Sequence, residues 1–424
     1  MVSLRRKRPC RSLTSCLALL TITTTSIQAA ERIAIEVHET AGIRRFSFPA
    51  SFAFNLSEPP SKGTNFRLLD EGKPIEAQFR ADGTQHDRSR WWLDFHTSLL
   101  PHHSKKFTLE YGTDVPAGPE RELGHKLTSI DDAYQVQYGP YISWTIRRDL
   151  GGLLKSVNYG QTEHVSPDST GLSLLDRNGE THPLDGTHES QVVARVVRDG
   201  PLAVALRFEV AHANPELRGV RSVVDLHLPV SRSWVEVDWK MIDPEGRTGG
   251  MRAELDLPLD APTSSAPTLV DFGATTMVYA ALHPGQQAAL RGAVATSAQN
   301  SPSESGYAWK ILRGPAGHLE PFVFSKRESE RNAEGWAHVM DRKSCLAMAI
   351  GEFARRSRDR ITISAEGSVQ LQRSFDTDDA PAQHSQERRF RFWLHFVNFP
   401  PQHGAGTSPQ AMQNPLDVRV LGGQ

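Results

Sequence analysis

Four side chains capable of binding or catalysis alternate along the segment RRFRFWLHFVNF (388–399). Arg389, Arg391, Trp393 and His395 occupy every second position, so a β-strand would present them on one face. A guanidinium binds a carboxylate through two parallel hydrogen bonds, and an indole stacks on the apolar face of a sugar ring. This pattern predicts a site for an acidic saccharide. The alternative is a solvated strand face with the indole packed under a loop.

A second segment, SWVEVDWKMID (233–243), places an aromatic platform beside two carboxylates. Trp234, Glu236 and Asp238 share one face, where they would bind sugar hydroxyls. The alternative is cross-strand pairing of the two carboxylates with Arg or Lys. The adjacent pair Trp91-Trp92 points to opposite faces of its strand, so we interpret both indoles as structural.

The segment GWAHVMDRKSCLAMAI (335–350) predicts a β-hairpin. Trp336 and His338 lie on one face of its first strand, Asp341 begins the polar turn, and Cys345 lies in the apolar return strand. His338 has the intrinsic pKa of a general acid or base, and Trp336 beside it would contact a sugar. Because the sequence contains no H-x-H, HExxH or CxxC pattern, we expect neither a metal nor a cofactor.

The elements that must position these residues are strands. PLAVALRFEVAH (201–212) alternates cleanly, and turn sequences such as DRNGE (176–180) and DPEGR (243–247) recur. We predict an all-β chain: a small barrel or sandwich over 31–125, then a unit of two large packed sheets over 126–399. Residues 400–424 are rich in Pro, Gly and Gln and predict a flexible tail.

The first thirty residues predict a signal peptide and hence an exported protein, periplasmic or secreted. A basic stretch precedes a short apolar one, and IQAA ends in small residues. Cys10 and Cys16 would leave with this segment, so the mature chain would hold one cysteine and no disulfide framework.

The net charge of the chain, −1, argues against nucleic acid as a partner. No stretch after the first thirty residues is apolar enough to span a bilayer. The oligomeric state is not predictable from these features.

The order of the segments resembles a known family. FRLLDEGKPIEAQFR and KKFTLEYG resemble the N-terminal RIFT-barrel-type domain of the exo-acting rhamnogalacturonan lyases, the YetA-like family. VDLHLPVSRSWVEVDWKMIDP, GWAHVMDRKSCLAMAIGEF and RRFRFWLHF resemble their central, galactose-mutarotase-like β-supersandwich. The likeness covers most of 31–399 and leaves out the C-terminal α/α toroid. It also departs from the family at GEFARRSRDRITI (351–363), where arginines replace an aromatic-rich strand.

This resemblance implies a polysaccharide context and transfers no catalytic residue. The leading hypothesis is a protein that handles an acidic, pectin-like polysaccharide, either as a non-catalytic binding module or as a lyase. Cleavage by β-elimination needs a cation on the uronate carboxylate, for which Arg389 and Arg391 are candidates. It also needs a base for the C5 proton, for which His338, His395 and Tyr307 are candidates. A structural envelope protein without a carbohydrate ligand is the third hypothesis.

Overall fold

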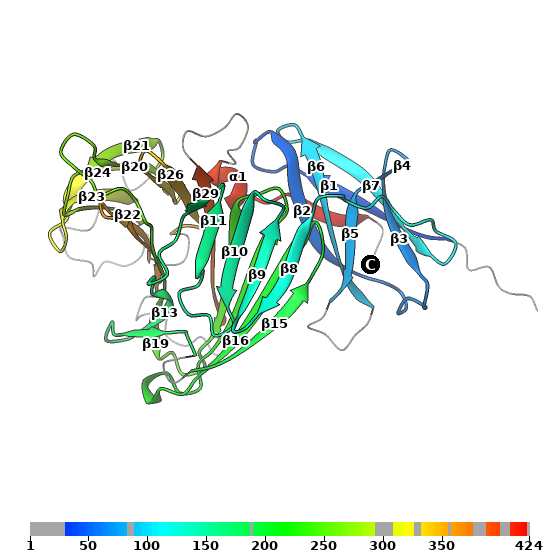
Figure 1. Cartoon of the computed structure of the whole chain (residues 1–424), viewed down its shortest axis with the longest axis horizontal. Coiled ribbons are helices and arrows are strands. Elements are labelled where there is room, and N and C mark those ends of the chain that lie inside the picture. Colours follow the sequence, from blue (N-terminus) through cyan, green and yellow to red (C-terminus); the bar gives the residue numbers. More distant parts are fainter. Residues whose placement is uncertain are drawn as a thin grey trace, which may run out of the picture.

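The structure, a computed structural model, describes residues 30–82, 89–186, 190–292, 308–325, 332–354, 358–375, 387–398 and 408–421. These residues form five antiparallel sheets and very little helix (Figure 1). The all-β prediction is therefore confirmed. Residues 1–29, which include most of the predicted signal peptide, lie outside the described part of the chain.

Two large sheets form the centre of the molecule. The nine-stranded sheet has the order β15-β16-β17-β18-β29-β26-β25-β20-β21, and the eight-stranded sheet has the order β14-β13-β19-β28-β27-β22-β23-β24. The strands of the nine-stranded sheet are β15 (Ser190–Arg198), β16 (Ala203–His212), β17 (Arg221–Pro229), β18 (Trp234–Ile242), β20 (Thr268–Gly273), β21 (Met277–Leu282), β25 (Trp336–Met340), β26 (Ser344–Ile350) and β29 (Glu387–Asn398). Those of the eight-stranded sheet are β13 (Gly171–Asp176), β14 (Thr181–Pro183), β19 (Thr248–Asp256), β22 (Gln286–Gly292), β23 (Trp309–Pro315), β24 (Glu320–Phe324), β27 (Arg358–Ser364) and β28 (Ser368–Ser374). A short 3-10 helix, η1 (Pro215–Leu217), lies between β16 and β17.

The period of two seen in the sequence accounts for the core between these sheets. On β29, Phe390, Phe392 and Phe396 are fully buried, and on β18 the same holds for Val237 and Trp239. They belong to one apolar cluster that also takes in the inward faces of β19, β22, β27 and β28. The predicted pair of packed sheets is therefore present.

A smaller sheet, with the order β12-β11-β10-β9-β8, contributes to the same core. Its strands are β8 (His125–Ile130), β9 (Ala133–Tyr138), β10 (Ile142–Arg147), β11 (Ser156–Tyr159) and β12 (Thr162–Glu163). Trp144 and Val136 on this sheet are fully buried in the central cluster. Figure 1 shows β8 to β11 running beside β15 and β16.

The N-terminal unit contains the other two sheets. One has the order β30-β1-β7-β3-β4 and the other β2-β6-β5. Their strands are β1 (Glu31–His38), β2 (Arg45–Asn55), β3 (Asn65–Asp70), β4 (Lys73–Ile75), β5 (Ala77–Ala81), β6 (Arg90–Leu99), β7 (Ser104–Gly112) and β30 (Asp417–Leu421). Their inward side chains form a second apolar cluster around Ile35, Leu93 and Leu109. The predicted boundary near residue 125 stays a prediction.

The second cluster also includes residues of the nine-stranded sheet. Trp234, Trp336, Trp393 and Ala349 lie on the sheet face opposite the central core, and all four pack with the N-terminal unit. The N-terminal unit therefore covers part of the sheet face that the sequence analysis assigned to ligand binding.

Residues 408–421 form a helix and a strand in place of the flexible tail that the sequence predicted. Pro409–Gln413 is a helix, α1, whose N-cap Ser408 accepts a hydrogen bond from the Ala411 amide at 3.1 Å. The strand that follows, β30, pairs along its whole length with residues Ala34 to His38 of β1. The prediction failed because it weighed composition alone, whereas Ala411, Met412 and Leu416 are buried in the second cluster.

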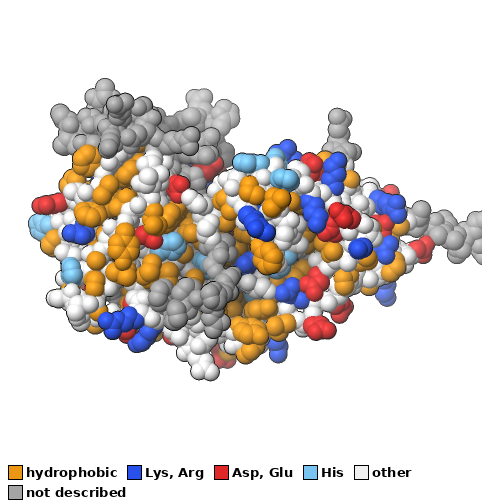
Figure 2. Space-filling view, turned by 90° about the horizontal axis from the view of Figure 1, so that it is seen from above, with side chains coloured by type: hydrophobic (Ala, Val, Ile, Leu, Met, Phe, Trp, Pro, Cys, Tyr) orange, Lys and Arg blue, Asp and Glu red, His pale blue; other side chains and the backbone are white. Residues whose placement is uncertain are grey.

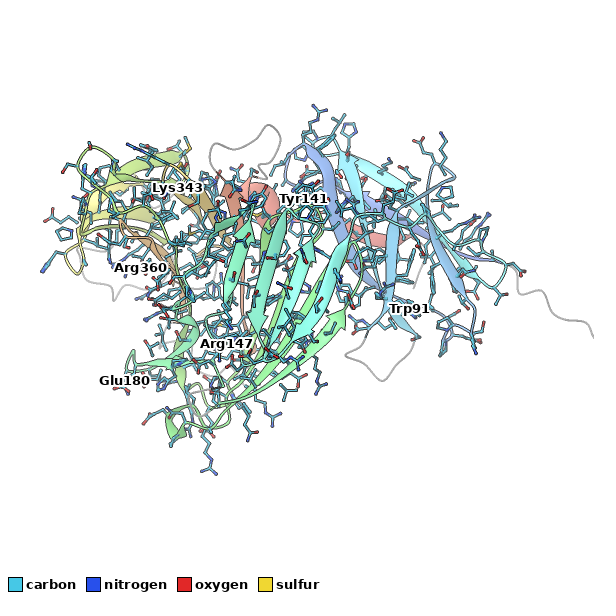
Figure 3. All side chains as sticks on the ribbon, in the orientation of Figure 1. Trp91, Tyr141, Arg147, Glu180, Lys343 and Arg360 are labelled. Atoms are coloured by element: carbon cyan, nitrogen blue, oxygen red, sulfur yellow. The ribbon has the colours of Figure 1, made fainter. Side chains whose placement is uncertain are left out.

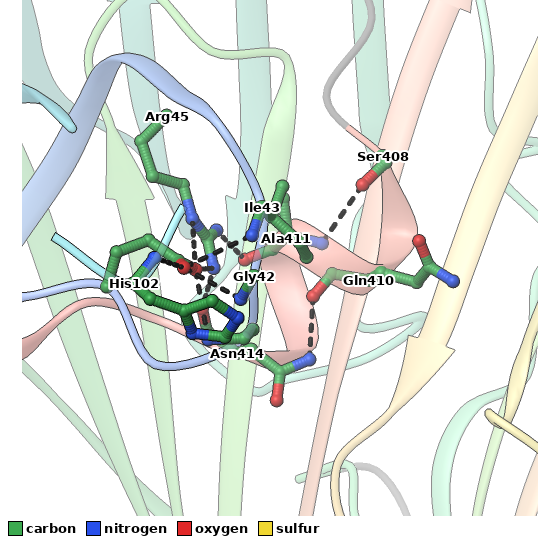
Figure 4. Close-up of polar contacts among 10 residues, drawn as sticks. Gly42, Ile43, Arg45, His102, Ser408, Gln410, Ala411 and Asn414 are labelled. Carbon is green, nitrogen blue, oxygen red and sulfur yellow. Dashed lines mark hydrogen bonds and ion pairs between the residues drawn. The ribbon is translucent and has the colours of Figure 1, made fainter. Parts of the chain in front are cut away.

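A buried ion pair holds α1 to the N-terminal unit (Figure 4). Arg45 and Glu39 are 2% and 0% exposed, and Arg45 Nη2 lies 3.0 Å from Glu39 Oε1. The same guanidinium donates to the carbonyl oxygens of Ala411 at 2.7 Å and Asn414 at 2.6 Å. Burial opposes ionisation of Glu39, but hydrogen bonds from the amide of His102 and from Arg45 lower its pKa to about 2. Each buried charge is thus compensated.

We expect the substitution Glu39→Gln to destabilise the protein by about 3–5 kcal/mol, because it leaves a buried guanidinium without its anion. Urea unfolding at pH 7 measures this free energy. The matched control is Arg32→Gln, since the Arg32 side chain is 71% exposed and its ion pair with Glu110 is worth about 1 kcal/mol or less. Equal losses for the two variants would contradict a structural role for the buried pair.

Buried neutral histidines predict a loss of stability in mild acid. Burial lowers the pKa of His125 to about 4 and that of His96 to about 3. Between these values and about 6.5 the unfolded chain binds more protons than the folded one, so stability falls as the pH falls through that window. For His125 alone the loss amounts to about 3 kcal/mol. Urea unfolding at several pH values should show a smaller slope for His125→Phe; an unchanged slope would exclude this residue as a cause.

Candidate functional site

The register of the nine-stranded sheet places the predicted residues in rows on one face. One row runs Arg207, Asp225, Asp238 and Arg391 across β16, β17, β18 and β29. The next row runs His227, Glu236, Trp393, Ala349 and Trp336 across β17, β18, β29, β26 and β25. Neighbouring strands lie about 4.8 Å apart, so each row brings its side chains into mutual contact.

The arginines of this face already bind carboxylates of the protein. Arg389 donates from Nε and Nη2 to both oxygens of Asp238, at 2.6 and 2.7 Å. Arg391 lies 2.7 Å from Glu236 Oε1, and Trp393 Nε1 donates to Glu236 Oε2 at 3.2 Å. The sequence analysis offered ligand binding and cross-strand pairing as alternatives for these residues, and the geometry shows cross-strand pairing.

These contacts keep the Asp238 carboxylate charged. Burial raises the pKa of Asp238, but the hydrogen bonds from Arg389 and the charge of Arg391 outweigh it and hold the pKa below its usual value. Beside them, burial and the charge of Arg198 lower the pKa of His227. His227 is therefore neutral, and its Nδ1 accepts from Arg198 Nη2 at 2.8 Å. The face thus combines fixed donors and acceptors with nearly balanced charge.

A cavity of about 280 Å³ lies between this face and the N-terminal unit. The sheet contributes Trp234, Glu236 and Asp238 to its lining. The full set of charged and aromatic lining residues is Phe48, Trp92, Asp94, Phe95, His96, Arg198, His227, Trp234, Glu236, Asp238, Arg389, Arg391 and Trp393. Three carboxylates face three guanidinium groups in this set, so the cavity has no net charge apart from its histidines.

Several buried polar atoms of this cavity have no partner. Trp92 Nε1, His96 Nε2 and Arg198 Nε are buried and make no hydrogen bond within the described residues. Arg198 otherwise binds Asp94 Oδ1 at 2.5 Å, and its guanidinium lies 4.3 Å from the centre of the Trp92 ring. Because buried polar groups are nearly always paired, such atoms lining a cavity indicate a place for a polar ligand or for water.

The sequence analysis missed the β6 side of this cavity. Trp92, Asp94 and His96 alternate on one strand, so the period-two signal was present in RWWLDFHTSL. Trp91 points the other way and packs 4.5 Å from Phe66. The interpretation of this pair as structural holds for the packing of Trp91, whereas Trp92 lines the cavity.

A second cavity, of about 550 Å³, adjoins the first. Arg389, Arg391 and Trp393 line both cavities. The second is lined as well by Glu334, Glu352, Arg373 and by Gln413, Asn414 and Pro415 at the end of α1 and just after it. Of these, Arg373 is paired with Asp359 through two hydrogen bonds, at 2.9 and 2.8 Å.

The predicted tryptophans are largely covered. Trp393 is 2% exposed, and the Arg391 guanidinium lies 4.8 Å from its ring centre. Trp234 is 4% exposed and packs against Phe48, with ring centres 5.6 Å apart. Trp336 is 8% exposed, and its Nε1 donates to the side chain of Glu334 at 2.6 Å. Trp234 lines the first cavity and Trp393 lines both, whereas Trp336 is absent from the lining of both.

His338 has an orienting partner that the sequence did not reveal. Its Nδ1 lies 2.6 Å from Asp271 Oδ1, and the same oxygen accepts from the His338 amide at 3.1 Å. Asp271 lies on β20, 67 residues away along the chain, and only the strand register brings it opposite His338. The pair could act in proton transfer, although His338 lines neither cavity.

Among the described residues, the arginines and histidines predicted for β-elimination lie at separate places. His395 and Arg391 are four positions apart on β29, which separates their Cα atoms by about 13 Å. His395 lines a third cavity of about 350 Å³ with Tyr138, Tyr141 and Tyr159; Tyr141 is labelled in Figure 3. Tyr307 lies outside the described residues.

The predicted hairpin over 335–350 is confirmed, with β25 and β26 paired from Trp336 to Met340. Asp341 caps its turn by accepting from the amides of Lys343 and Ser344, at 2.7 and 2.8 Å. Burial, followed by the charges of Asp271 and Asp341, raises the pKa of the Cys345 thiol to about 12. The thiol is therefore protonated and a poor nucleophile.

One group among the described residues has metal-ligand spacing: Asp176, Glu180 and His182, whose ligand atoms lie within 4.8 Å of one another. Asn214 uses its Oδ1 to accept from the amide of Glu216, so its Nδ2 donates to His182 Nδ1 at 3.0 Å. That assignment places the proton on His182 Nε2, which faces Asp176 Oδ2 at 3.6 Å. A protonated nitrogen cannot bind a metal, so a histidine–carboxylate pair explains this group better.

The polar cavities lie apart from an apolar end of the sandwich. Seen from above, hydrophobic side chains gather over the lobe that holds β20 to β24, whereas charged ones are more frequent over the N-terminal unit (Figure 2). Met277 and Tyr279 on β21 and Phe322 and Phe324 on β24 are exposed there. In the part of the chain that the structure describes, no helix has the length and apolar character needed to cross a membrane.

Comparison with known proteins supports the fold and leaves the family open. No family model and no curated protein matches the chain. A glycosyl hydrolase family 38 protein from Enterococcus faecalis is similar in structure, with a TM-score of 0.52 and 10% sequence identity over 92% of this chain. A galactose mutarotase related enzyme from Lactobacillus acidophilus, at 12% identity over 62% of this chain and 97% of its own, has a TM-score of 0.35. A GH36 alpha-galactosidase from Geobacillus stearothermophilus, at 10% identity over 65% of this chain and 40% of its own, has a TM-score of 0.31.

The chain spans 47% of the family 38 protein, so that likeness concerns the fold of one part of a larger protein. It supports the arrangement of β-sheets described above. The resemblance to exo-acting rhamnogalacturonan lyases rests on the sequence segments alone.

Proposed function

We propose that this protein binds a saccharide in the two adjoining cavities between the nine-stranded sheet and the N-terminal unit. The observation that carries the proposal is the lining of the first cavity, where Trp92 Nε1, His96 Nε2 and Arg198 Nε are buried without partners. A hydroxyl group both donates and accepts, so sugar hydroxyls can pair with such atoms and with the carboxylates of Glu236 and Asp238. The volumes, about 280 and 550 Å³, suit a mono- or oligosaccharide.

The balance of positive and negative side chains in the cavities indicates whether the saccharide is acidic or neutral. The hypothesis of an acidic, rhamnogalacturonan-like ligand assumed that Arg389 and Arg391 were free to bind a uronate. Because Asp238 and Glu236 already occupy these guanidinium groups, a uronate would have to share them with a protein carboxylate. Balanced ion pairs favour the recognition of hydroxyls, so within the cavities we propose a neutral sugar unit. A uronate in the same polysaccharide would bind elsewhere.

Binding without turnover accords better with the geometry than β-elimination does. Arg391 lies in the first row and Arg389 lies two positions before it on β29, and both are paired with carboxylates of β18. His338 and His395 lie at other places on the sheet. Incubation with rhamnogalacturonan should therefore give no ultraviolet absorbance from unsaturated uronate; a steady rise would establish the lyase. Export of the protein is part of this proposal and rests on the N-terminal segment.

The substitution Trp92→Phe tests the saccharide site. It removes one unpaired N–H and keeps an aromatic ring under Arg198. We expect the variant to bind neutral galactan and rhamnose-containing oligosaccharides on the order of tenfold more weakly than the parent, because it loses about one hydrogen bond to the sugar. Calorimetric titration measures this affinity. The stability of the free protein should not fall, because no protein partner is lost.

The matched control is Trp91→Phe, on the same strand and facing Phe66 in the N-terminal core (Figure 3 labels Trp91). This variant should lose stability and keep its saccharide affinity. Absence of saccharide binding by the unaltered protein would overturn the proposal. If both variants bind the saccharide as tightly as the parent, the saccharide does not bind in this cavity.

A further inference from the structure

The eight-stranded sheet carries a row of arginines on the face turned away from the core. The register places Arg291 on β22 opposite Arg360 on β27, then Gln372 on β28, then Arg252 on β19. The residues that alternate with them, such as Leu290, Ile361 and Ala253, belong to the central core. The three guanidinium groups therefore share one sheet face, on the opposite side of the sandwich from the two cavities.

No carboxylate in the described part of the chain acts as a counterion for these arginines. Within the described residues none of the three forms an ion pair, and the only hydrogen bond from their side chains is from Arg252 Nη1 to Thr181 at 3.1 Å. The Nε atoms of Arg252, Arg291 and Arg360 are all buried without a partner. Burial, together with the charges of Arg291 and Arg252, lowers the pKa of Arg360 to about 10. An anion would relieve both the missing hydrogen bonds and the like-charge repulsion.

The arginines of this row differ from those of the cavities in that they lack carboxylate partners among the described residues. Arg389 is matched by Asp238 and Arg391 by Glu236, whereas no carboxylate of the described residues matches Arg291 or Arg360. An exposed arginine needs no partner because water solvates it, but the guanidinium groups of this row are half-buried. Figure 3 labels Arg360 on the side of the sheet away from β9 to β11.

We propose that this row is a second binding site, specific for the carboxylate groups of an acidic polysaccharide. Arg291 and Arg360 lie on adjacent strands, about 5 Å apart, so one carboxylate can bridge them. Arg252 lies two strands beyond Arg360, at about 10 Å, and binds a second carboxylate of the same chain. A linear polymer with repeated uronates presents such groups in sequence. The assignment to a polysaccharide rests on the proposed function; the anion preference rests on the row itself.

The test uses the full protein and oligogalacturonides as the probe. The double variant Arg291→Gln/Arg360→Gln should bind them at least tenfold more weakly at low ionic strength, since it removes two charge-assisted contacts. A control with the same charge change, Arg32→Gln/Arg195→Gln, removes side chains that are 71% and 56% exposed, and it should bind as the parent does. Equal weakening of both variants would show a general charge effect and overturn the site.

Two further measurements separate this row from its alternatives. Without ligand, Arg360→Gln should raise the melting temperature in low salt, because it removes an unpaired charge beside Arg291; a purely structural arginine would give a decrease. Inorganic sulfate and a sulfated dextran serve as the other anion sources. Tighter binding of either one than of oligogalacturonide would overturn the assignment to carboxylates. Loss of neutral-sugar binding in Trp92→Phe with retained oligogalacturonide binding would show that the two sites are separate.

Discussion

The nine-stranded sheet must have both of its faces covered, and most of the molecule follows from that requirement. One face presents the phenylalanines of β29 to the eight-stranded sheet. The other presents Trp234, Trp336 and Trp393, whose indoles are too large and apolar to be left in water. The N-terminal unit and α1 cover them, and the buried pair of Arg45 and Glu39 fixes that cover. The cavities remain where the cover does not reach the sheet.

This arrangement gives the buried charges a role beyond stability. Burying a guanidinium without its anion would destabilise the protein, and the arginines that line the first cavity have carboxylate partners, as Arg198 has Asp94 and Arg391 has Glu236. The resulting pairs are fixed in place and nearly neutral. They are suited to hydrogen-bonding a hydroxylated ligand in a defined orientation and less suited to attracting a charged one.

The sequence predicted the strands well because a period of two is a local property. It therefore predicted which residues of β18 and β29 share a face, and it predicted the hairpin of β25 and β26. It could not predict what lies opposite each face. Asp271, the partner of His338, is 67 residues distant, and the cover over Trp234 comes from β2, at the other end of the chain. The prediction of a flexible tail failed for the same reason, since β30 is stabilised by pairing with β1.

Two R-x-R segments of the chain show that strand register supplies information that the local sequence lacks. R-x-R occurs at Arg389 and Arg391 and again at Arg358 and Arg360, with the same alternation, and sequence reasoning chose the first as an anion site. In the fold, β29 lies beside β18, which supplies Glu236 and Asp238, whereas Arg360 on β27 lies between Arg291 and Gln372. Identical local patterns thus give a neutral surface in one sheet and an unneutralised one in the other. The arginines that distinguish this sequence from the resembling lyases, GEFARRSRDRITI, include one of the unneutralised set.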